Sequence, residues 1–473
     1  MQSQRKRWIL ALCCLAQFMV VLDVAIVNVA LPSIRRDLGF SAVNLQWIVN
    51  AYTLTFAGFL LLGGRAADLL GPRRVLIAGL LLFGLASLAG GLSSGQGQLI
   101  VARAVQGLGG AVVLPATLSI ITTTFAEGAE RNRALAAWGA MGALGGSTGG
   151  LAGGVLTQLL GWEWILFVNV PIGVAGALAA RRLLSASIPT RAPRRELDVA
   201  GALTVTAGLV LLTFAIVRTE VNGWLSFPTL IVAGAGLALL ATFVAIEGRF
   251  AARPLMPLRI FRSRSLTGAN LVVFALGSAA FAMWYFVSLY LQQVLGYSAI
   301  RAGLAFAPMS LSIAVASPIA ARLVSRMGPG PVLTIGMSMI GVGMLLFSLM
   351  PADGSYLADV LAPSIVTAVG IGFSFVPVTI AAVSGGAREE AGLASGLVNT
   401  SRQIGGSLGL AILATISTAR TGDVAQVGET SAQALAEGFG LAFAVGAGFA
   451  FAGALVALTL LARPASPPEP VPV

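Results

Sequence analysis

Histidine is absent from this chain of 473 residues, and cysteine occurs only twice. Without histidine the chain lacks the side chain that most often titrates near neutral pH and the commonest metal ligand. Cys13 and Cys14 are adjacent in an apolar run, where helix neighbours cannot form an unstrained disulfide, so we interpret them as packing residues. The sequence therefore predicts no metal site, and any proton transfer depends on carboxylates.

Charge is also scarce. Only 10% of the residues are charged and 57% are hydrophobic, whereas soluble domains have about 25% charged residues. There is no phosphate-binding G-x-x-x-x-G-K-[ST] motif and no catalytic triad, which argues against an enzyme and against direct use of ATP. We expect a membrane protein that needs no cofactor and is driven by an ion gradient.

Long apolar runs fill the chain. The first, from Trp8 to Leu31, contains a single charge, Asp23, and is long enough to cross a bilayer. Its length and its charge predict a retained anchor instead of a cleaved signal. Further runs lie at about 43–63, 75–94, 97–119, 134–158, 164–181, 199–217, 226–246, 266–291, 302–321, 331–350, 357–381, 392–418 and 438–462. The sequence predicts an all-α integral membrane protein with fourteen transmembrane helices.

Basic residues predict the orientation. Most arginines fall in loops on the same side as the N-terminus, and the opposite loops hold only Arg35, Arg36, Arg218, Arg301 and Arg420. By the positive-inside rule both termini are cytoplasmic, and the net charge of +11 indicates topology and not nucleic-acid binding. We expect a multi-pass protein of the bacterial inner membrane.

An internal repeat indicates two related halves. RAADLLGPRRVLIAG, from Arg65, aligns with RLVSRMGPGPVLTIG, from Arg322, and each lies in the loop between the second and third helices of its half. Such repetition predicts parallel bundles with a substrate path between them. We expect a six-helix bundle at 1–182, two inserted helices at 183–265, a second six-helix bundle at 266–463 and a cytoplasmic tail at 464–473.

The motifs resemble those of a known family. RAADLLGPRR is similar to the cytoplasmic loop motif of the major facilitator superfamily. LDVAIVNVALP, VARAVQGLGGAVVLP, GALGGSTGGLAGG, WEWILFVNVPIG and SGLVNTSRQIGGSLG resemble, in order, signatures of its fourteen-helix drug:proton antiporter branch, with actinobacterial antibiotic exporters as the nearest type. The resemblance implies a major facilitator fold in a monomer that exchanges protons for amphipathic organic compounds.

Asp23 and Arg103 are predicted to lie at similar depth in the membrane. Arginine does not readily lose its proton, so a buried Arg103 needs an acceptor, and Asp23 is the carboxylate available. A conformational change that alters their separation would bind or release a proton. The resemblance gives the same proton-coupling role to both residues; a static ion pair that only orients helices is the alternative.

Two glycine-containing motifs have structural alternatives. The resemblance implies a cytoplasmic gate made by Gly64, Asp68, Gly71, Arg73 and Arg74, where Asp68 pairs with one of the two arginines, although Pro72 displaces the family's basic pattern by one position. A solvated loop that sets topology is the alternative. The antiporter motif corresponds to Gly145, Gly149, Gly150, Gly153 and Gly154, with Gly150 in place of the usual proline. These glycines also suit a purely structural contact between helices.

Candidate substrate contacts are the polar and aromatic residues within the apolar runs: Gln17, Asn28, Asn50, Tyr52, Trp138, Trp284, Tyr285, Asn399, Arg402 and Gln403. An apolar wall with a few polar groups suits an amphipathic molecule. Arg402 either extends to the cytoplasm, which we favour, or attracts an anionic substrate. The predicted function is proton-coupled drug or antibiotic export by alternating access. The alternatives are export of an endogenous metabolite for self-resistance, proton-coupled import, or a non-transporting sensor or scaffold.

Overall fold

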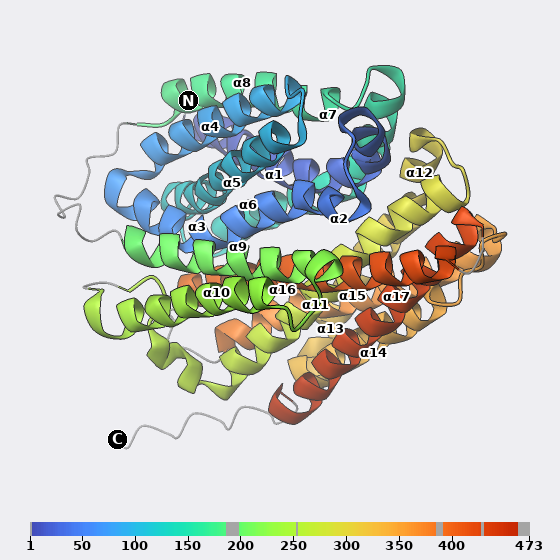
Figure 1. Ribbon diagram of the computed structural model, residues 1–473. Coiled ribbons are helices and arrows are strands. Elements are labelled where there is room, and N and C mark those ends of the chain that lie inside the picture. The colour runs from blue at the N-terminus through green and yellow to red at the C-terminus, as the bar shows by residue number, and fades with distance from the viewer. Residues whose placement is uncertain (1, 186–197, 252–253, 385–390, 427–429, 462–473) are drawn as a thin grey trace.

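The computed structural model describes the chain except for residues 1, 186–197, 252–253, 385–390, 427–429 and 462–473. Within the described residues every regular element is a helix, and 12 helical segments are long and apolar enough to cross a membrane. Two bundles lie one above the other in Figure 1, with a helical hairpin against their junction. The prediction of an all-helical fold is confirmed.

The N-terminal bundle is built around α1. Its helices are α1 (Gln2–Leu38), α2 (Ala42–Leu45), α3 (Trp47–Leu70), α4 (Pro72–Gly91), α5 (Gln96–Thr124), α6 (Ala129–Leu159), α7 (Trp164–Phe167) and α8 (Asn169–Leu183). α1 packs mainly against α6, and α5 packs against both α3 and α4. We call the end that holds the start of α1 and the α3–α4 turn the proximal end, and the opposite end the distal end.

The C-terminal bundle is built in the same way. It consists of α11 (Arg264–Leu289), α12 (Ala299–Ala305), α13 (Ala307–Met327), α14 (Pro329–Phe347), α15 (Leu361–Ser384), α16 (Ala391–Gln426) and α17 (Ser431–Val456), with π-helical turns at Tyr290–Val294, Tyr356–Val360 and Ala457–Leu461. α11 packs against α16, as α1 packs against α6, and α15 lies against α13 and α14. The repeated arrangement agrees with the sequence repeat.

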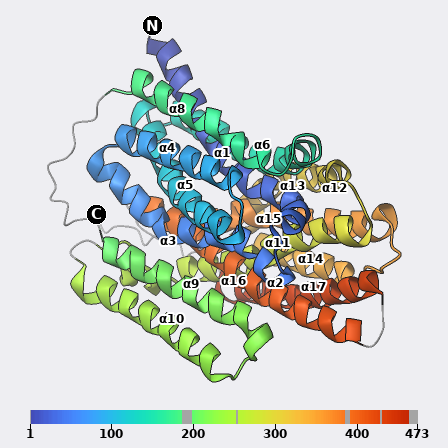
Figure 2. The same ribbon diagram turned by 45° about the horizontal axis from the view of Figure 1, so that its top comes forward.

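A hairpin of α9 (Val199–Asn222) and α10 (Phe227–Ala245) connects the bundles. α9 packs against α3 of one bundle and α16 of the other, and α10 packs on α9 at the edge of the molecule (Figure 2). The contact is close, since a Cβ added to Gly58 would lie 1.9 Å from the Thr206 hydroxyl oxygen. The hairpin therefore covers the junction of the bundles on one side.

Two of the predicted spans, α6 and α16, are not among the 12 segments that satisfy the length and apolarity criteria. α6 is rich in glycine, and α16 contains polar and charged residues along its length. Both pack between helices that do satisfy these criteria. The count of fourteen spans thus rests on how these two helices are interpreted.

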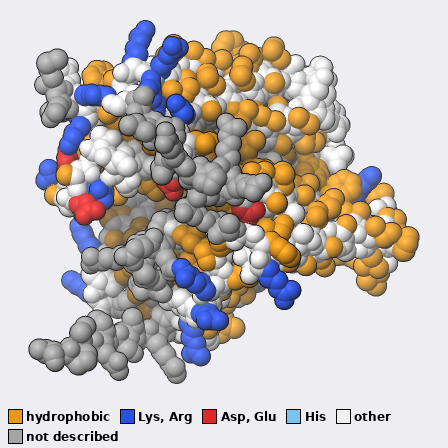
Figure 3. Space-filling view, turned by 90° about the vertical axis from the view of Figure 1, so that its left-hand side faces the viewer, with side chains coloured by type: hydrophobic (Ala, Val, Ile, Leu, Met, Phe, Trp, Pro, Cys, Tyr) orange, Lys and Arg blue, Asp and Glu red, His pale blue; other side chains and the backbone are white. Residues whose placement is uncertain are grey.

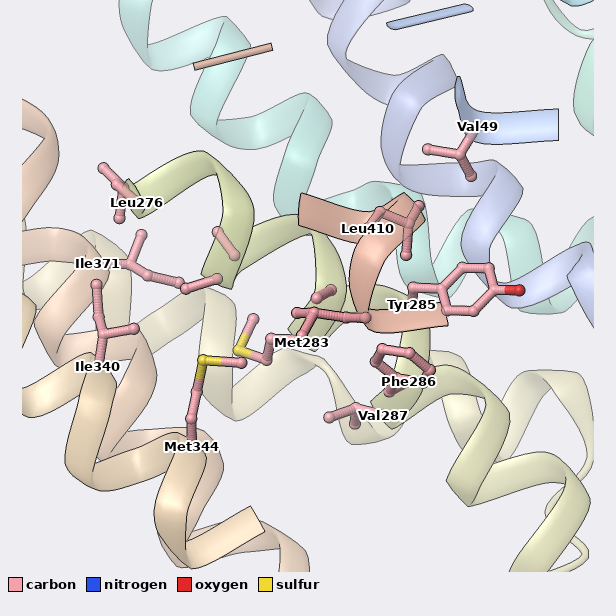
Figure 4. Close-up of a cluster of buried hydrophobic side chains, with 14 of the residues drawn as sticks. Val49, Leu276, Met283, Tyr285, Phe286, Val287, Ile340, Met344, Ile371 and Leu410 are labelled. Carbon is pink, nitrogen blue, oxygen red and sulfur yellow. The ribbon is translucent and has the colours of Figure 1, made fainter. Parts of the chain in front are cut away.

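The two bundles share a continuous apolar core. Figure 4 shows side chains from α11, α14, α15 and α16 packed together, among them Met283, Phe286, Met344 and Leu410, with Val49 of α3 nearby. On the proximal end, which faces the viewer in Figure 3, Lys and Arg side chains outnumber Asp and Glu side chains. The flank beside this end is largely hydrophobic. This distribution is that of a protein whose sides face lipid and whose proximal end faces water.

Glycines set the spacing of α1 and α6. A Cβ added to Gly145, Gly149 or Gly153 would lie 2.4–2.8 Å from atoms of Phe18, Ala25 or Ile26. Contacts this short exclude any side chain unless the helices move apart. Gly139, on the same helix, has no atom within 4 Å of such a Cβ.

We predict that Gly153→Ala destabilises the protein by about 1–3 kcal/mol, because the added methyl group overlaps the Ile26 carbonyl oxygen. Gly139→Ala is the matched control and should leave stability unchanged or raise it slightly, because alanine favours helix. The measurement is the apparent unfolding temperature in detergent by size-exclusion chromatography after heating. Equal behaviour of the two variants would contradict the close α1–α6 contact.

Candidate functional site

Asp23 is fully buried in the middle of α1 and accepts three hydrogen bonds. Its Oδ2 accepts from Arg103 Nη1 at 2.6 Å, and its Oδ1 accepts from Gln106 Nε2 at 2.6 Å and from Asn169 Nδ2 at 2.8 Å. A buried carboxylate is tolerated when it is paired with an opposite charge and its lone pairs are hydrogen-bonded. These contacts occupy both carboxylate oxygens of Asp23.

Arg103 is enclosed as completely as its partner, with 2% of its surface exposed. Its Nη1 also donates to Gln106 Oε1 at 2.6 Å, and its Nε donates to the Ile48 carbonyl oxygen at 3.1 Å. The guanidinium lies 4.5 Å from the centre of the Tyr52 ring. The structure thus brings together Asp23 and Arg103, which the sequence predicts to face one another.

Close packing of α5 on α3 positions Arg103. A Cβ added to Gly107 would lie 2.3 Å from the Tyr52 carbonyl oxygen, so glycine is required for the two helices to approach. Gln106 then reaches α4, where its Nε2 donates to the Ser87 hydroxyl at 2.8 Å. The polar cluster therefore ties α1, α4, α5 and α8 to one another.

Sequence reasoning missed Gln106, Asn169 and Ser87 as members of this cluster. Gln106 follows Arg103 by three residues and so lies on the same helix face, which is a signal that could have identified it. Asn169 is an amide within an apolar run, and the sequence does not show that α8 packs near Asp23. Ser87 carries no signal, because serine is common in membrane helices.

The predicted gate motif forms the α3–α4 turn. Gly71 adopts φ +90°, a conformation that favours glycine, and Pro72 begins α4. Arg73 Nη2 donates to the Arg181 carbonyl oxygen at 2.7 Å, at the end of α8. Among the described contacts, Asp68 pairs with neither Arg73 nor Arg74, and its charged neighbour is Arg65. In this state Arg73 is directed toward α8, and the gate pairing of Asp68 stays a prediction.

The antiporter glycines face two helices. Gly145, Gly149 and Gly153 face α1, whereas Gly154 contacts the opposite bundle, where a Cβ would lie 2.4 Å from the Ala299 carbonyl oxygen. Gly150 also approaches α12, at Gly303. One helix thus combines close packing against α1 with a contact between the bundles.

The candidate substrate contacts fall into two groups. Five of them are buried in this state, namely Gln17, Asn50, Tyr52, Tyr285 and Gln403. The partly exposed ones are Asn28, Trp138, Trp284, Asn399 and Arg402. Trp138 donates to Thr117 at 3.1 Å, Trp284 packs on Phe306, and Arg402 donates to Asn399 at 3.1 Å. Tyr285 also lines a cavity of about 40 Å³ beside Arg35 at the distal end.

The described hydrogen bonds between the bundles lie in the distal half of the molecule. Pro32 has no N–H, so the Asn28 carbonyl oxygen of α1 lacks its usual helical partner. Ser288 of α11 donates to that oxygen at 2.7 Å, and Gln292 donates to the Val29 carbonyl oxygen at 3.0 Å. A carbonyl freed by a proline thus becomes an acceptor for the other bundle.

Further distal hydrogen bonds support this contact. Arg35 Nη1 donates to Gln293 at 3.3 Å, and the Ile300 N–H donates to Gln158 Oε1 at 3.2 Å. Ser407 donates to Asn50 at 3.0 Å, near the distal start of α3. The structure is therefore a state in which the bundles are joined at their distal ends.

Comparison with known proteins agrees with this architecture. A model of the Major Facilitator Superfamily matches residues 13–410. The cephamycin export protein CmcT of Amycolatopsis lactamdurans is 43% identical over 411 residues, which cover 86% of this chain and 84% of that protein. The puromycin resistance protein pur8 of Streptomyces alboniger is 40% identical, over 93% of this chain and 89% of that protein.

Solved structures share the fold at low sequence identity. The crystal structure of the POT family transporter PepTSo superposes with a TM-score of 0.71 at 15% identity, and the superposition covers 97% of each chain. A bacterial homologue of the human lysosomal transporter Spinster, solved in an inward-facing conformation, gives a TM-score of 0.66 at 18% identity. At these sequence identities the similarity shows a shared fold alone.

We predict that Arg103→Gln lowers stability by about 3–5 kcal/mol, because it leaves the Asp23 carboxylate buried without a cation. The double variant Asp23→Asn with Arg103→Gln should recover most of that loss, because no charge is then buried. Heating followed by size-exclusion chromatography in detergent measures both variants. If the double variant is as unstable as Arg103→Gln alone, the loss of stability does not come from an unpaired Asp23 carboxylate, and the prediction is wrong.

We predict that Ser288→Ala weakens the distal contact, because it removes the donor to the Asn28 carbonyl oxygen. Spin labels at Leu92 and Leu349, both exposed at distal helix ends, should report a distance distribution shifted to longer values. The labels require a background in which Cys13 and Cys14 are alanine. Ser312→Ala, which removes a hydrogen bond within α13 alone, should not change the distribution. An unchanged distribution in Ser288→Ala would contradict the prediction.

Proposed function

This chain belongs to the Major Facilitator Superfamily, and we propose that it exports drugs or antibiotics in exchange for protons. Several relatives that match most of the chain are named for antibiotic export or resistance, such as the lincomycin resistance protein of Streptomyces lincolnensis. Their likeness supports an exporter of amphipathic organic compounds. The superfamily is one of transporters, so the chain is not an enzyme.

The observation that carries proton coupling is the buried contact of Asp23 with Arg103, Gln106 and Asn169. Arg103 cannot readily give up its proton, so Asp23 is the member of the cluster that can change charge. When α1 and α5 separate, loss of the guanidinium favours protonation of the buried carboxylate, and their return favours release. A proton is thus exchanged once per conformational cycle.

The proton gradient is sufficient for this exchange. One charge that moves through 100 mV releases about 2.3 kcal/mol, and a tenfold proton gradient adds about 1.4 kcal/mol. Together these correspond to a solute gradient of several hundredfold for each proton. No nucleotide or other cofactor enters the proposal.

For the topology, we propose fourteen transmembrane helices, in which α6 and α16 complete the 12 apolar segments. Both are long and pack among those segments, and the Gly-rich surface of α6 fits tightly against α1. The bundles then comprise 1–182 and 266–463, with the inserted hairpin at 183–265, and the predicted tail at 464–473 lies outside the described residues. The excess of basic residues at the proximal end supports both termini in the cytoplasm, and we place the chain as a monomer in the bacterial inner membrane.

In this orientation the described state is closed toward the outside. The distal hydrogen bonds of Ser288, Gln292 and Gln158 join the bundles there. Alternating access requires these bonds to break while contacts at the proximal end form. The gate motif, Gly64, Asp68, Gly71, Arg73 and Arg74, lies at the end that closes, and Gly150 and Gly154 lie where α6 moves against α12.

Export of a compound made by the cell itself is a second candidate function. The relative named as a cephamycin export protein and the tetracenomycin C resistance and export protein of Streptomyces glaucescens favour it. Both candidates use the same transport cycle and differ in the range of substrates. A narrow substrate profile would select the second.

We predict that Asp23→Asn abolishes export, because the proton-binding group is lost. Efflux of a panel of lipophilic dyes and antibiotics is measured in cells that express equal amounts of each variant in the membrane, with and without a protonophore. Asp37→Asn is the matched control: this exposed carboxylate at the end of α1 accepts a hydrogen bond from Trp162, and its loss should leave efflux intact. Wild-type rates in Asp23→Asn would refute the coupling role.

A further inference from the structure

The charges within the two bundles are not balanced alike. In the N-terminal bundle the charge of Arg103 is matched by Asp23 at 2.6 Å. In the C-terminal bundle Arg402 makes no ion pair with any residue that the structure describes, and its Nε is buried without a hydrogen-bond partner. Among the described residues, Arg402 is therefore a positive charge without an ion-pair partner.

Arg402 extends toward α15. Its helix contacts α11 through the hydrogen bond from Ser401 to Asn270, and it contacts α3 through the hydrogen bond from Ser407 to Asn50. At about 100° per residue, Arg402 lies about 100° from Ser401 and about 140° from Ser407, so it is on the side of α16 turned away from the Ser407 contact with α3. Its guanidinium lies 5.2 Å from the centre of the Phe375 ring on α15. The side chain thus lies between α16 and α15 of the C-terminal bundle.

One donor of Arg402 has a partner on its own helix. Nη2 donates to Asn399 Oδ1 at 3.1 Å, while the Asn399 amide nitrogen donates to the Ser395 carbonyl oxygen of its own helix. Asn399 is thereby held as an acceptor and fixes one edge of the guanidinium. Phe375 covers its face with an apolar surface and contributes no charge.

A planar guanidinium binds a carboxylate with two parallel hydrogen bonds. An arginine inside a membrane protein without an acid is costly, and an anion that binds there offsets that cost. We infer that Arg402, oriented by Asn399, binds the carboxylate of the exported compound, with its apolar part against Phe375. The substrate class is thus the amphipathic organic acid. This inference rests on the proposed export function.

The probes are rhodamine B, which has a free carboxylate, and its ethyl ester, which has the same ring system without that charge. Binding of each to purified wild type, Arg402→Gln and Arg402→Lys is measured by fluorescence polarisation in detergent. We expect Arg402→Gln to weaken binding of the acid by about tenfold or more and to leave binding of the ester unchanged. Arg402→Lys should retain part of the difference, because it keeps the charge but not the planar pair of donors.

Arg301→Gln is the matched control, since it removes an exposed arginine of the same bundle that lies over Tyr297 at the distal end. It should change binding of neither dye. Elution volume and unfolding temperature verify that each variant is folded. An equal loss for acid and ester in Arg402→Gln, no loss for either, or no preference of wild type for the acid would overturn the inference.

Export of the same dyes separates this inference from the proposed function. Suppose that wild type binds the acid through Arg402 but that a proton gradient does not drive transport of the acid in proteoliposomes. The binding site then stands and the proposed function fails. If export is proton-driven but acid and ester respond alike to Arg402→Gln, export stands and the site fails.

Discussion

A charge inside a membrane protein is costly unless another charge matches it, and the architecture of the N-terminal bundle follows from such a match. Asp23 and Arg103 lie on different helices, and each is completely enclosed, so neither α1 nor α5 can move away without exposing an unpaired charge to an apolar region. Gln106 and Asn169 satisfy the remaining oxygen atoms and extend the constraint to α8. Such a cluster favours discrete arrangements of the helices over continuous deformation.

Close helix packing makes the cluster possible. α5 approaches α3 because Gly107 has no side chain, and α1 approaches α6 because Gly145, Gly149 and Gly153 have none. In a bilayer, where lipid is as apolar as leucine, such backbone contacts supply much of the attraction between helices. Glycine is therefore both a packing residue and a condition for the buried polar contacts, and α6 uses the same residue type to reach the opposite bundle.

Much of the fold is readable from the sequence, because a helix that spans lipid must be apolar over a fixed length. Each predicted run coincides with a helix or a pair of consecutive helices, and the two halves repeat as RAADLLGPRR and RLVSRMGPGP indicate. The pair of Asp23 and Arg103 was also predictable, because only one carboxylate was available to the arginine. Asn169 was not, since its place beside Asp23 depends on the packing of α8. The direction of Arg73 was not predictable either, because it depends on where α8 ends.

The inserted hairpin, whose first helix contacts α3 and α16, has a consequence for the ancestry of the chain. A connection that crosses the bilayer twice returns to the leaflet from which it departed. The second bundle therefore keeps the polarity of the first whether the hairpin is present or not. A single inserted crossing would have inverted that bundle and destroyed the parallel duplication. A duplicated transporter can thus gain or lose such a hairpin in one step, and the orientation of its two halves in the membrane does not change.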